Sequence, residues 1–527
     1  VVKVPDIRVI PANAEITLKS KSTITAALAI LDEPPFRFLT KAGQKVDIAE
    51  GQAEVVADLK LKLVKNLKTE DISYGVTGKL THMRSDTIVK NRTLSAEVLS
   101  VVADPAHLEI SRDAGLDSVP VSGTWRQAFG PEGKAKSRVE GKLELSPATL
   151  KAFAITLPDG AVSGKGWGRF TLDLLRDQPA NFHLESDLAG LELRIPEVVW
   201  TKPASQKGSL VIAGALATPT RIDRLELDAA GLQAKGKLVL AADGSFESAI
   251  FPGAALGDWF SGNVTLTGRG KGKSVALAID GGQADLRRSR FGKASAKAAD
   301  SAPMAIALDQ LQISDGIRLN GFSGQFSTNG GFSGDFTASV NAKAPIRGAV
   351  ATAGNGHSAF RIEADDAGQT LAAAGIYESG REGSLSLILQ PRDQTGTYDG
   401  TLKITNIRVV NAPGLAGLLN AISVVGLINQ LQGAGIVFSD VTGKFLLTSD
   451  AIEIQEGSAI GASLGVAAAG VFRMADQALD LQGVISPIYL VNGIGQIFSR
   501  QRDGLFGFNY TLSGTKDATK VSVNPLS

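Results

Sequence analysis

The most constraining feature of this chain is a strand pattern that recurs along most of its length, a glycine followed by residues that alternate between apolar and polar. The template Gly-x-[Leu/Val/Phe]-x-[Leu/Ile] begins at Gly141, Gly168, Gly208, Gly236, Gly262, Gly383, Gly400 and Gly443. Alternation with a period of two is typical of a β-strand with one apolar and one polar face. Turn dipeptides such as Asp243-Gly244 separate these runs. We therefore expect a degenerate array of hairpins, each supported by its neighbours.

The apolar positions of these hairpins should share one face of a sheet. The predicted members of that face are Leu143, Leu145, Phe170, Leu172, Leu210, Ile212, Leu238, Leu240, Val264, Leu266, Leu385, Leu387, Leu402, Ile404, Phe445 and Leu447. A sandwich would cover such a face with a second sheet, and a barrel would close the sheet on itself. A continuous hairpin array has a third option, which is to curl into an open trough.

Length and composition favour the open trough. The chain has 527 residues, 59 of them glycine, and only 6% are aromatic. A single compact core rarely serves more than ~250–300 residues. We therefore expect a mainly β fold in which an elongated, curled antiparallel sheet forms an open apolar groove, with short helices near the C-terminal end.

A stretch without any charged residue or histidine runs from Val409 to Ser439. At ~100° per residue, Leu415, Leu418, Leu419, Ile422 and Val425 share one helical face, and Leu427, Ile428 and Leu431 lie on roughly the opposite side. This predicts two short helices within residues 411–433, beginning at Pro413 and broken near Gly426. A membrane-spanning helix would need ~20 mainly apolar residues, and polar residues interrupt this span. The helices either plug the apolar face of the sheet or contact lipid.

A second charge-free stretch, Val484–Ser499, lies close by and is followed by Arg500 and Arg502. We expect a further apolar helix over residues 484–499. Two apolar segments at one end of a long apolar sheet suggest a covered or gated terminus.

Charge and cysteine content exclude several classes of protein. The 54 basic and 53 acidic residues give a net charge of +1, which argues against the strongly basic surface that nucleic acids require. The absence of cysteine excludes disulfides and thiolate metal sites. The chain begins Val1-Val2-Lys3, so we expect a mature or trimmed piece of a longer protein.

No pattern in the sequence indicates catalysis, a metal or a cofactor. The histidines His82, His107, His183 and His357 are scattered without ligand spacing. The segment GRGKGKS (268–274) resembles a phosphate loop but lies between two strand patterns, so we expect a hairpin turn. Asp365-Asp366 is interpreted as a solvated turn. The basic residues Arg287, Arg288 and Arg290 either contact lipid phosphates or protect a strand edge.

The C-terminal part of the chain resembles a known family. The tail GLFGFNYTLSGTKDATKVSVNPLS (504–527), the preceding GVISPIYLVNGIGQIFSR, and PGLAGLLNAISVVGLINQLQGAGIVFSDVTGKF are similar to the C-terminal region of the bacterial AsmA-like proteins. The large periplasmic members of the YhdP type are the most similar, and TamB is more distant. The specific resemblance covers about residues 400–527. The family usually carries Asp-Pro after the SGT turn, where this chain has Lys516-Asp517-Ala518-Thr519, and its members normally begin with a membrane anchor.

The resemblance implies a bridge-like lipid transport protein of the bacterial periplasm. It implies a repetitive β-groove (1–405) followed by an AsmA-like C-terminal region (406–527), with an inner-membrane anchor supplied by an N-terminal helix outside this sequence. Phospholipid acyl chains would be the cargo. The inner and outer membranes, with an outer-membrane or periplasmic protein, would be the partners.

Two other functions compete with a lipid conduit. A scaffold for assembling outer-membrane proteins would use long exposed strand edges to pair with client strands. A carbohydrate-processing β-solenoid enzyme would need aromatic platforms and paired acids on one face, whereas the chain has only four tryptophans. We expect a conduit and no enzyme.

Overall fold

The computed structural model describes the chain except for residues 35–36, 66, 68–70, 90, 130–135, 154, 156, 158–159, 196–199, 244, 271–272, 289–301, 329–330, 488–506, 516–517 and 525–527. The protein is mainly β, with 61% strand and 10% helix. It divides into two compact units, Val1–Gly257 (unit 1) and Asp258–Ser527 (unit 2). The boundary expected between residues 405 and 406 lies inside a strand of unit 2.

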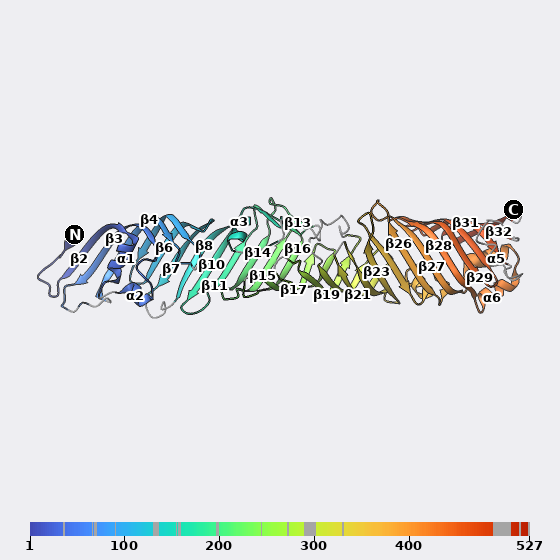
Figure 1. Ribbon diagram of the computed structural model, residues 1–527, viewed down its shortest axis with the longest axis horizontal. Coiled ribbons are helices and arrows are strands. Elements are labelled where there is room, and N and C mark those ends of the chain that lie inside the picture. Colours follow the sequence, from blue (N-terminus) through green and yellow to red (C-terminus); the bar gives the residue numbers. More distant parts are fainter. Residues whose placement is uncertain are drawn as a thin grey trace. The chain divides into compact units, whose positions relative to one another are not determined.

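Unit 1, blue to green in Figure 1, consists largely of strands. Its strands are β1 (Val2–Lys3), β2 (Asn13–Thr23), β3 (Glu50–Lys62), β4 (Ser73–Ser85), β5 (Leu94–Ala103), β6 (His107–Leu116), β7 (Val119–Ala128), β8 (Lys136–Leu145), β9 (Val162–Gly164), β10 (Gly166–Leu175), β11 (Asn181–Ser186), β12 (Leu191–Ile195), β13 (Trp200–Lys202), β14 (Ser209–Ala215), β15 (Arg221–Ala229), β16 (Leu232–Leu240) and β17 (Phe246–Leu256). Its helices are α1 (Ile24–Asp32), α2 (Phe38–Ala42) and α3 (Pro147–Ala152).

The main sheet of unit 1 follows the order of the chain. Strands β1 to β8, β10, β11 and β14 to β17 pair antiparallel, each with the next. The insertions that carry α1 and α2, α3 and β9, and β12 and β13 follow β2, β8 and β11. In an antiparallel array these three strands run in the same direction and end on the same side of the sheet. All three insertions therefore lie along that side, at the ends of the strands.

Strands β9, β12 and β13 form a separate three-stranded sheet. The fully buried Lys202 holds it together, because its Nζ donates hydrogen bonds to the carbonyl oxygens of Leu188 and, at 2.7 Å, of Leu191. The indole N–H of Trp200 donates to the carbonyl oxygen of Ala230 at 3.0 Å. That bond ties the small sheet to the β15–β16 turn of the main sheet.

Unit 2 is also built mainly of strands. They are β18 (Phe260–Thr267), β19 (Ala276–Asp285), β20 (Pro303–Gln312), β21 (Arg318–Ser327), β22 (Ser333–Val340), β23 (Ala344–Thr352), β24 (Ser358–Ala364), β25 (Gly380–Arg381), β26 (Ser384–Pro391), β27 (Tyr398–Val409), β28 (Ile436–Leu447), β29 (Ala451–Gly461), β30 (Gly465–Arg473), β31 (Ala478–Ser486), β32 (Phe508–Thr515) and β33 (Ala518–Asn524). The helices are α4 (Ala367–Ala373), α5 (Pro413–Ala421) and α6 (Val425–Gln432).

The sheet of unit 2 is mixed, because β19 and β20 pair in parallel. The expectation of a purely antiparallel sheet is therefore wrong at this pair. The remaining neighbours from β20 to β33 pair antiparallel, with β24 next to β26 and the short β25 beside β27. The sheet is curled and not closed.

Glycines face bulky apolar residues across the strands. Gly168 pairs with Leu143, and Gly348 pairs with Phe336. Side chains two residues apart lie on the same face of a strand, so the glycine that opens each template lies on the apolar face itself. Alternating large and small residues lets side chains of neighbouring strands interdigitate on this face. The glycines thus give the bulky apolar residues room there.

Candidate functional site: the apolar face

The strand register of unit 1 places every lining residue predicted there on one face. Gly168 pairs with Leu143 and Phe170 with Leu184, and Leu184 pairs in turn with Ile212. Partners on neighbouring strands point to the same side of a sheet. The face continues through Leu225 on β15 to Gly236 on β16. It therefore holds Leu143, Leu145, Phe170, Leu172, Leu210, Ile212, Leu238 and Leu240 together.

This face is only half-buried along much of unit 1. All the lining residues predicted in unit 1 are partly accessible. The buried apolar cluster of unit 1 lies around α1 and β3–β6, where it contains Ile24, Ala49, Ala53, Met83, Ala96 and Leu99. Between β7 and β17 the buried apolar residues include Val119, Leu188, Leu191, Trp200 and several alanines, and none of them belongs to this cluster. A contiguous apolar surface left in this state is typical of a binding surface.

The same face continues through unit 2. Val264 pairs with Ile279 and Leu385 with Ile404, while Leu402 pairs with Gly443. The partners that link β19 to β26 are Ile279, Ile306, Gly324, Phe336, Gly348, Ile362 and Leu387. The register thus places Val264, Leu266, Leu385, Leu387, Leu402, Ile404, Phe445 and Leu447 on one side. Leu385 and Ile404 are buried in the core of unit 2, and the other six are half-buried.

Helices α5 and α6 lie in the neutral segment, but their break is not where the sequence predicted it. The turn runs through Ile422–Val424, with Ser423 in a left-handed conformation (φ 59°). Gly426 lies inside α6. Val425 therefore starts the second helix and is 65% exposed, which corrects its assignment to the same helical face as Leu415 and Leu418. Leu418, Leu419, Leu427 and Leu431 are buried, while Leu415, Ile422 and Ile428 are half-buried.

The two helices pack on the sheet near the C-terminal end of unit 2. Helix α5 contacts β33 and α6 contacts β28. A Cβ at Gly417 would lie 2.9 Å from a methyl carbon of Val521. Val521 pairs with Leu512 and so belongs to the apolar face. Helix α5 therefore covers that face at the last strand.

A helix was expected over residues 484–499, but the first residues of this segment are not helical. Residues Val484–Ser486 are the end of β31. The register pairs Ile485 with Phe508, and Ile485 is fully buried. Residues 488–499 lie outside the described part of the chain.

Helix α1, near the N-terminus, was not expected from the sequence. Its nine-residue segment ITAALAILD is apolar except for Thr25 and Asp32, so its periodicity is hard to recognise over so short a length. The N-cap residue Thr23, whose hydroxyl accepts a hydrogen bond from the Ala26 N–H at 3.2 Å, is the signal that could have revealed it. Helix α1 covers the apolar face at β3, so in the structure helices lie near both chain ends.

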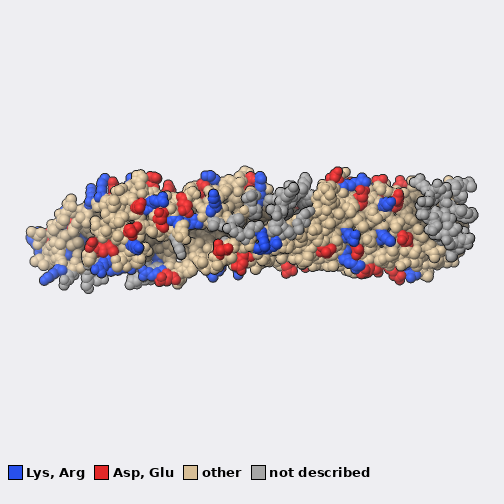
Figure 2. Space-filling view, viewed as in Figure 1, with Lys and Arg blue, Asp and Glu red and all other residues tan. Residues whose placement is uncertain are grey.

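The opposite face of the sheet carries paired charges. Arg138 and Asp173 lie 2.7 Å apart on neighbouring strands, and Lys444 lies 2.9 Å from Glu456. On the side drawn in Figure 2, basic and acidic side chains are interspersed in each unit. Asp365, expected in a solvated turn, accepts hydrogen bonds from Arg347, which lowers the pKa of its carboxyl. These ion pairs make one face of the sheet polar and hydrated, while the other face is apolar.

The remaining basic candidates have acidic partners where the structure describes them. Arg287 pairs with Asp285 and Asp315, and Arg288 pairs with Asp258, which favours protection of a strand edge over contact with lipid phosphates. Arg290 lies outside the described residues. Residues 268–274 connect the antiparallel strands β18 and β19, as a hairpin connection would.

The histidines and carboxylates build no metal centre in the part of the chain that the structure describes. There, no group of three or more His, Cys, Asp or Glu side chains could hold a metal ion. His183 contacts Glu185 and His107 contacts Asp104, each as an isolated pair. Among the described helices, none is long and apolar enough to span a bilayer.

Comparison with known proteins adds no relative: no family model, no curated protein and no solved structure matches this chain.

Proposed function

We propose that this chain conducts phospholipids along a hydrophobic groove formed by the apolar face of its curled sheet, between the inner and outer bacterial membranes. The observation that carries the proposal is the half-buried apolar face of β8 to β16, on which every predicted lining residue remains partly accessible. The membranes at either end, the periplasmic location and the inner-membrane anchor rest on the resemblance of residues 400–527 to AsmA-like proteins.

Acyl chains fit this face for a simple physical reason. Each CH₂ group removed from water contributes ~0.8 kcal/mol, so an apolar lining removes most of the cost of carrying a lipid between membranes. The headgroup can remain in water beyond the edge of the sheet. No residue needs to perform covalent chemistry.

The scaffold alternative receives less support. It requires long free strand edges, and among the described residues the two-residue β1 does leave most of the eleven-residue β2 unpaired on one side, but a scaffold gives no reason for an apolar face. A scaffold would contact its client strands through the strand edges, so it could tolerate charged residues on the apolar face. The register instead places apolar residues on the lining from strand to strand.

Photo-crosslinking tests the conduit at two adjacent residues of β10. Leu172 points to the apolar face, and Thr171, which pairs with Glu140 and His183, points to the other. A photoreactive phenylalanine analogue at position 172 should form phospholipid adducts when the purified chain is mixed with phosphatidylethanolamine and phosphatidylglycerol vesicles. The same residue at position 171 should not. Equal adduct yields at both positions, or none at either, would contradict the proposal.

A further inference from the structure

Phenylalanine side chains gather on the apolar face of unit 2 at β21 and β22. The ring of Phe322 lies 5.1 Å from that of Phe336 and 6.1 Å from that of Phe326, measured between centroids. Phe332, just before β22, stacks on Phe326 at 5.0 Å. We call Phe322, Phe326, Phe332 and Phe336 the aromatic cluster. Three of them, Phe322, Phe326 and Phe336, are buried.

Two of these rings lie over glycines of the same face. A Cβ at Gly348 would lie 2.3 Å from the Cζ of Phe336, and one at Gly324 would lie 2.6 Å from the Cζ of Phe326. Each ring is thus held against the sheet at a position where no side chain competes with it.

Along the register row of Phe336 the apolar residues on both sides are more accessible, although Leu385 and Ile404, two residues along the same strands β26 and β27, are buried as well. On one side, Val264 and Leu266 of β18 are half-buried. On the other, Leu387 of β26 and Leu402 of β27 are half-buried. The register places the cluster between them on the same side of the sheet. In this stretch the face is covered by the side chains of the protein itself.

We propose that the aromatic cluster is a constriction that an acyl chain must open as it passes along the apolar face of unit 2. This inference rests on the proposed conduit. A hydrocarbon chain cannot occupy volume that close-packed rings already fill. Its passage requires Phe322, Phe326 and Phe336 to rotate off their neighbours, and that rotation sets a barrier to movement along the face.

The first test uses the absence of cysteine from the chain, which makes any introduced thiol unique. Single cysteines replace Leu266, Leu402 and the buried Ala338, which lies two residues beyond Phe336, and each variant reacts with N-dodecylmaleimide. Leu266→Cys and Leu402→Cys should react readily. Ala338→Cys should react ~10-fold or more slowly, since a buried thiol reacts only through local opening. Adding Phe336→Ala should remove most of that protection.

The second test measures transfer of a fluorescent phospholipid between vesicles of phosphatidylethanolamine and phosphatidylglycerol. Phe336→Ala should speed transfer about fivefold, which corresponds to ~1 kcal/mol removed from the barrier. Phe336→Leu, which keeps an apolar side chain, should remain folded and give a smaller increase. The matched control is Ile388→Ala, which removes a half-buried side chain of β26 that pairs with Arg361 and Thr401 on the opposite face of the sheet and should leave the rate unchanged.

The outcomes separate the constriction from the conduit. If Ala338→Cys reacts as fast as the other two thiols, or if neither Phe336 variant speeds transfer, the cluster is ordinary core and the constriction is overturned while the conduit stands. If Leu266→Cys and Leu402→Cys fail to react and the unchanged chain transfers no lipid, the conduit fails and the constriction falls with it.

Discussion

Phe445 on β28 lies directly over its register partner Gly400 on β27, so that a Cβ at Gly400 would lie 2.2 Å from the Cζ of the ring. Both residues belong to the apolar face. The pair shows what the recurring glycines do in this protein. Gly400, like Gly348 beside Phe336, leaves space for a neighbour's ring to lie flat, and at other glycines such as Gly236 the backbone of the next strand comes close.

A methyl group added at such a glycine should destabilise the sheet. A Cβ at Gly236 would lie 1.9 Å from the carbonyl oxygen of Ile250 and 2.7 Å from the ring of Phe251. Gly236→Ala should cost ~1–3 kcal/mol, as overpacking typically does, and hydrogen exchange should quicken in β16 and β17. Gly75→Ala is the matched control, because its Cβ meets nothing within 4 Å. Equal exchange in the two variants would refute this explanation of the glycines.

A charge on the apolar face should abolish lipid binding without unfolding unit 1. Leu238 and Val239 are adjacent in β16, and Val239 is 39% exposed on the other face. Leu238→Asp should lose binding of a fluorescent phospholipid, because a carboxylate in a hydrocarbon path must give up its hydration. Val239→Asp should bind lipid normally. Leu238 suits this test better than Leu385, which is buried in the core of unit 2 and would unfold when charged.

Helix α5 should detach from the sheet when Gly417 is enlarged. The side chain of Val521 leaves no room for one at Gly417, whereas a Cβ at Gly426 in α6 meets nothing within 4 Å. Gly417→Leu should increase proteolysis and hydrogen exchange at residues 413–421. Gly426→Leu should leave both unchanged. Undisturbed exchange in Gly417→Leu would mean that α5 is not held by β33.

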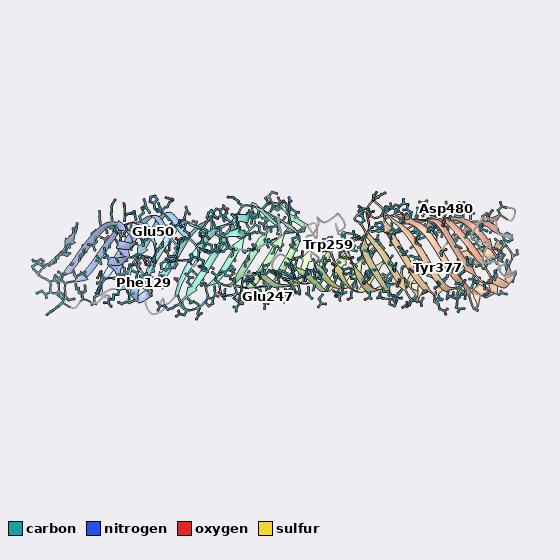
Figure 3. All side chains as sticks on the ribbon, viewed as in Figure 1. Glu50, Phe129, Glu247, Trp259, Tyr377 and Asp480 are labelled. Carbon is teal, nitrogen blue, oxygen red and sulfur yellow. The ribbon has the colours of Figure 1, made fainter. Side chains whose placement is uncertain are left out.

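Unit 2 should lose stability in alkali because it buries two neutral tyrosines. Burial raises the pKa of Tyr377 and of Tyr510 to about 12, from an ordinary value of 10.0. Tyr377 packs against the core of unit 2 (Figure 3), and the Tyr510 hydroxyl donates to the carbonyl oxygen of Ala467 at 2.8 Å.

A phenol that holds its proton more tightly when folded stabilises the folded state below pH 10, and that contribution disappears as the pH rises toward 12. Urea unfolding between pH 9 and 12 should therefore show a falling midpoint for unit 2. The midpoint should fall less steeply in the Tyr377→Phe/Tyr510→Phe variant. Parallel pH profiles for the two proteins would contradict the assignment.

The sequence was sufficient to predict which residues share the apolar face, and the reason is physical. Alternation fixes the side of a strand on which a residue lies, and antiparallel hairpins carry that side from one strand to the next. Leu143 and Ile212 could therefore be grouped before their register was known. The glycine template likewise marked the strands of both units.

Other features depend on backbone conformation and tertiary packing, which a local sequence pattern does not contain. Helix α1 has nine residues and only two polar ones, Thr25 and Asp32, so periodicity was a poor guide to it. The left-handed Ser423 ends α5 early, which changes the helical phase of Val425. The aromatic cluster arises only when register brings Phe322 next to Phe336 from a neighbouring strand. How far each lining residue is buried depends on the curl of the whole sheet.

The most direct test of the conduit is native mass spectrometry of the purified chain, followed by organic extraction and identification of the lipids. The account predicts co-purifying phospholipid that is lost in a Leu172→Asp/Leu238→Asp variant of unchanged fold. A lipid-free chain, or a variant that retains its phospholipid, would contradict the claim that the apolar face carries lipid.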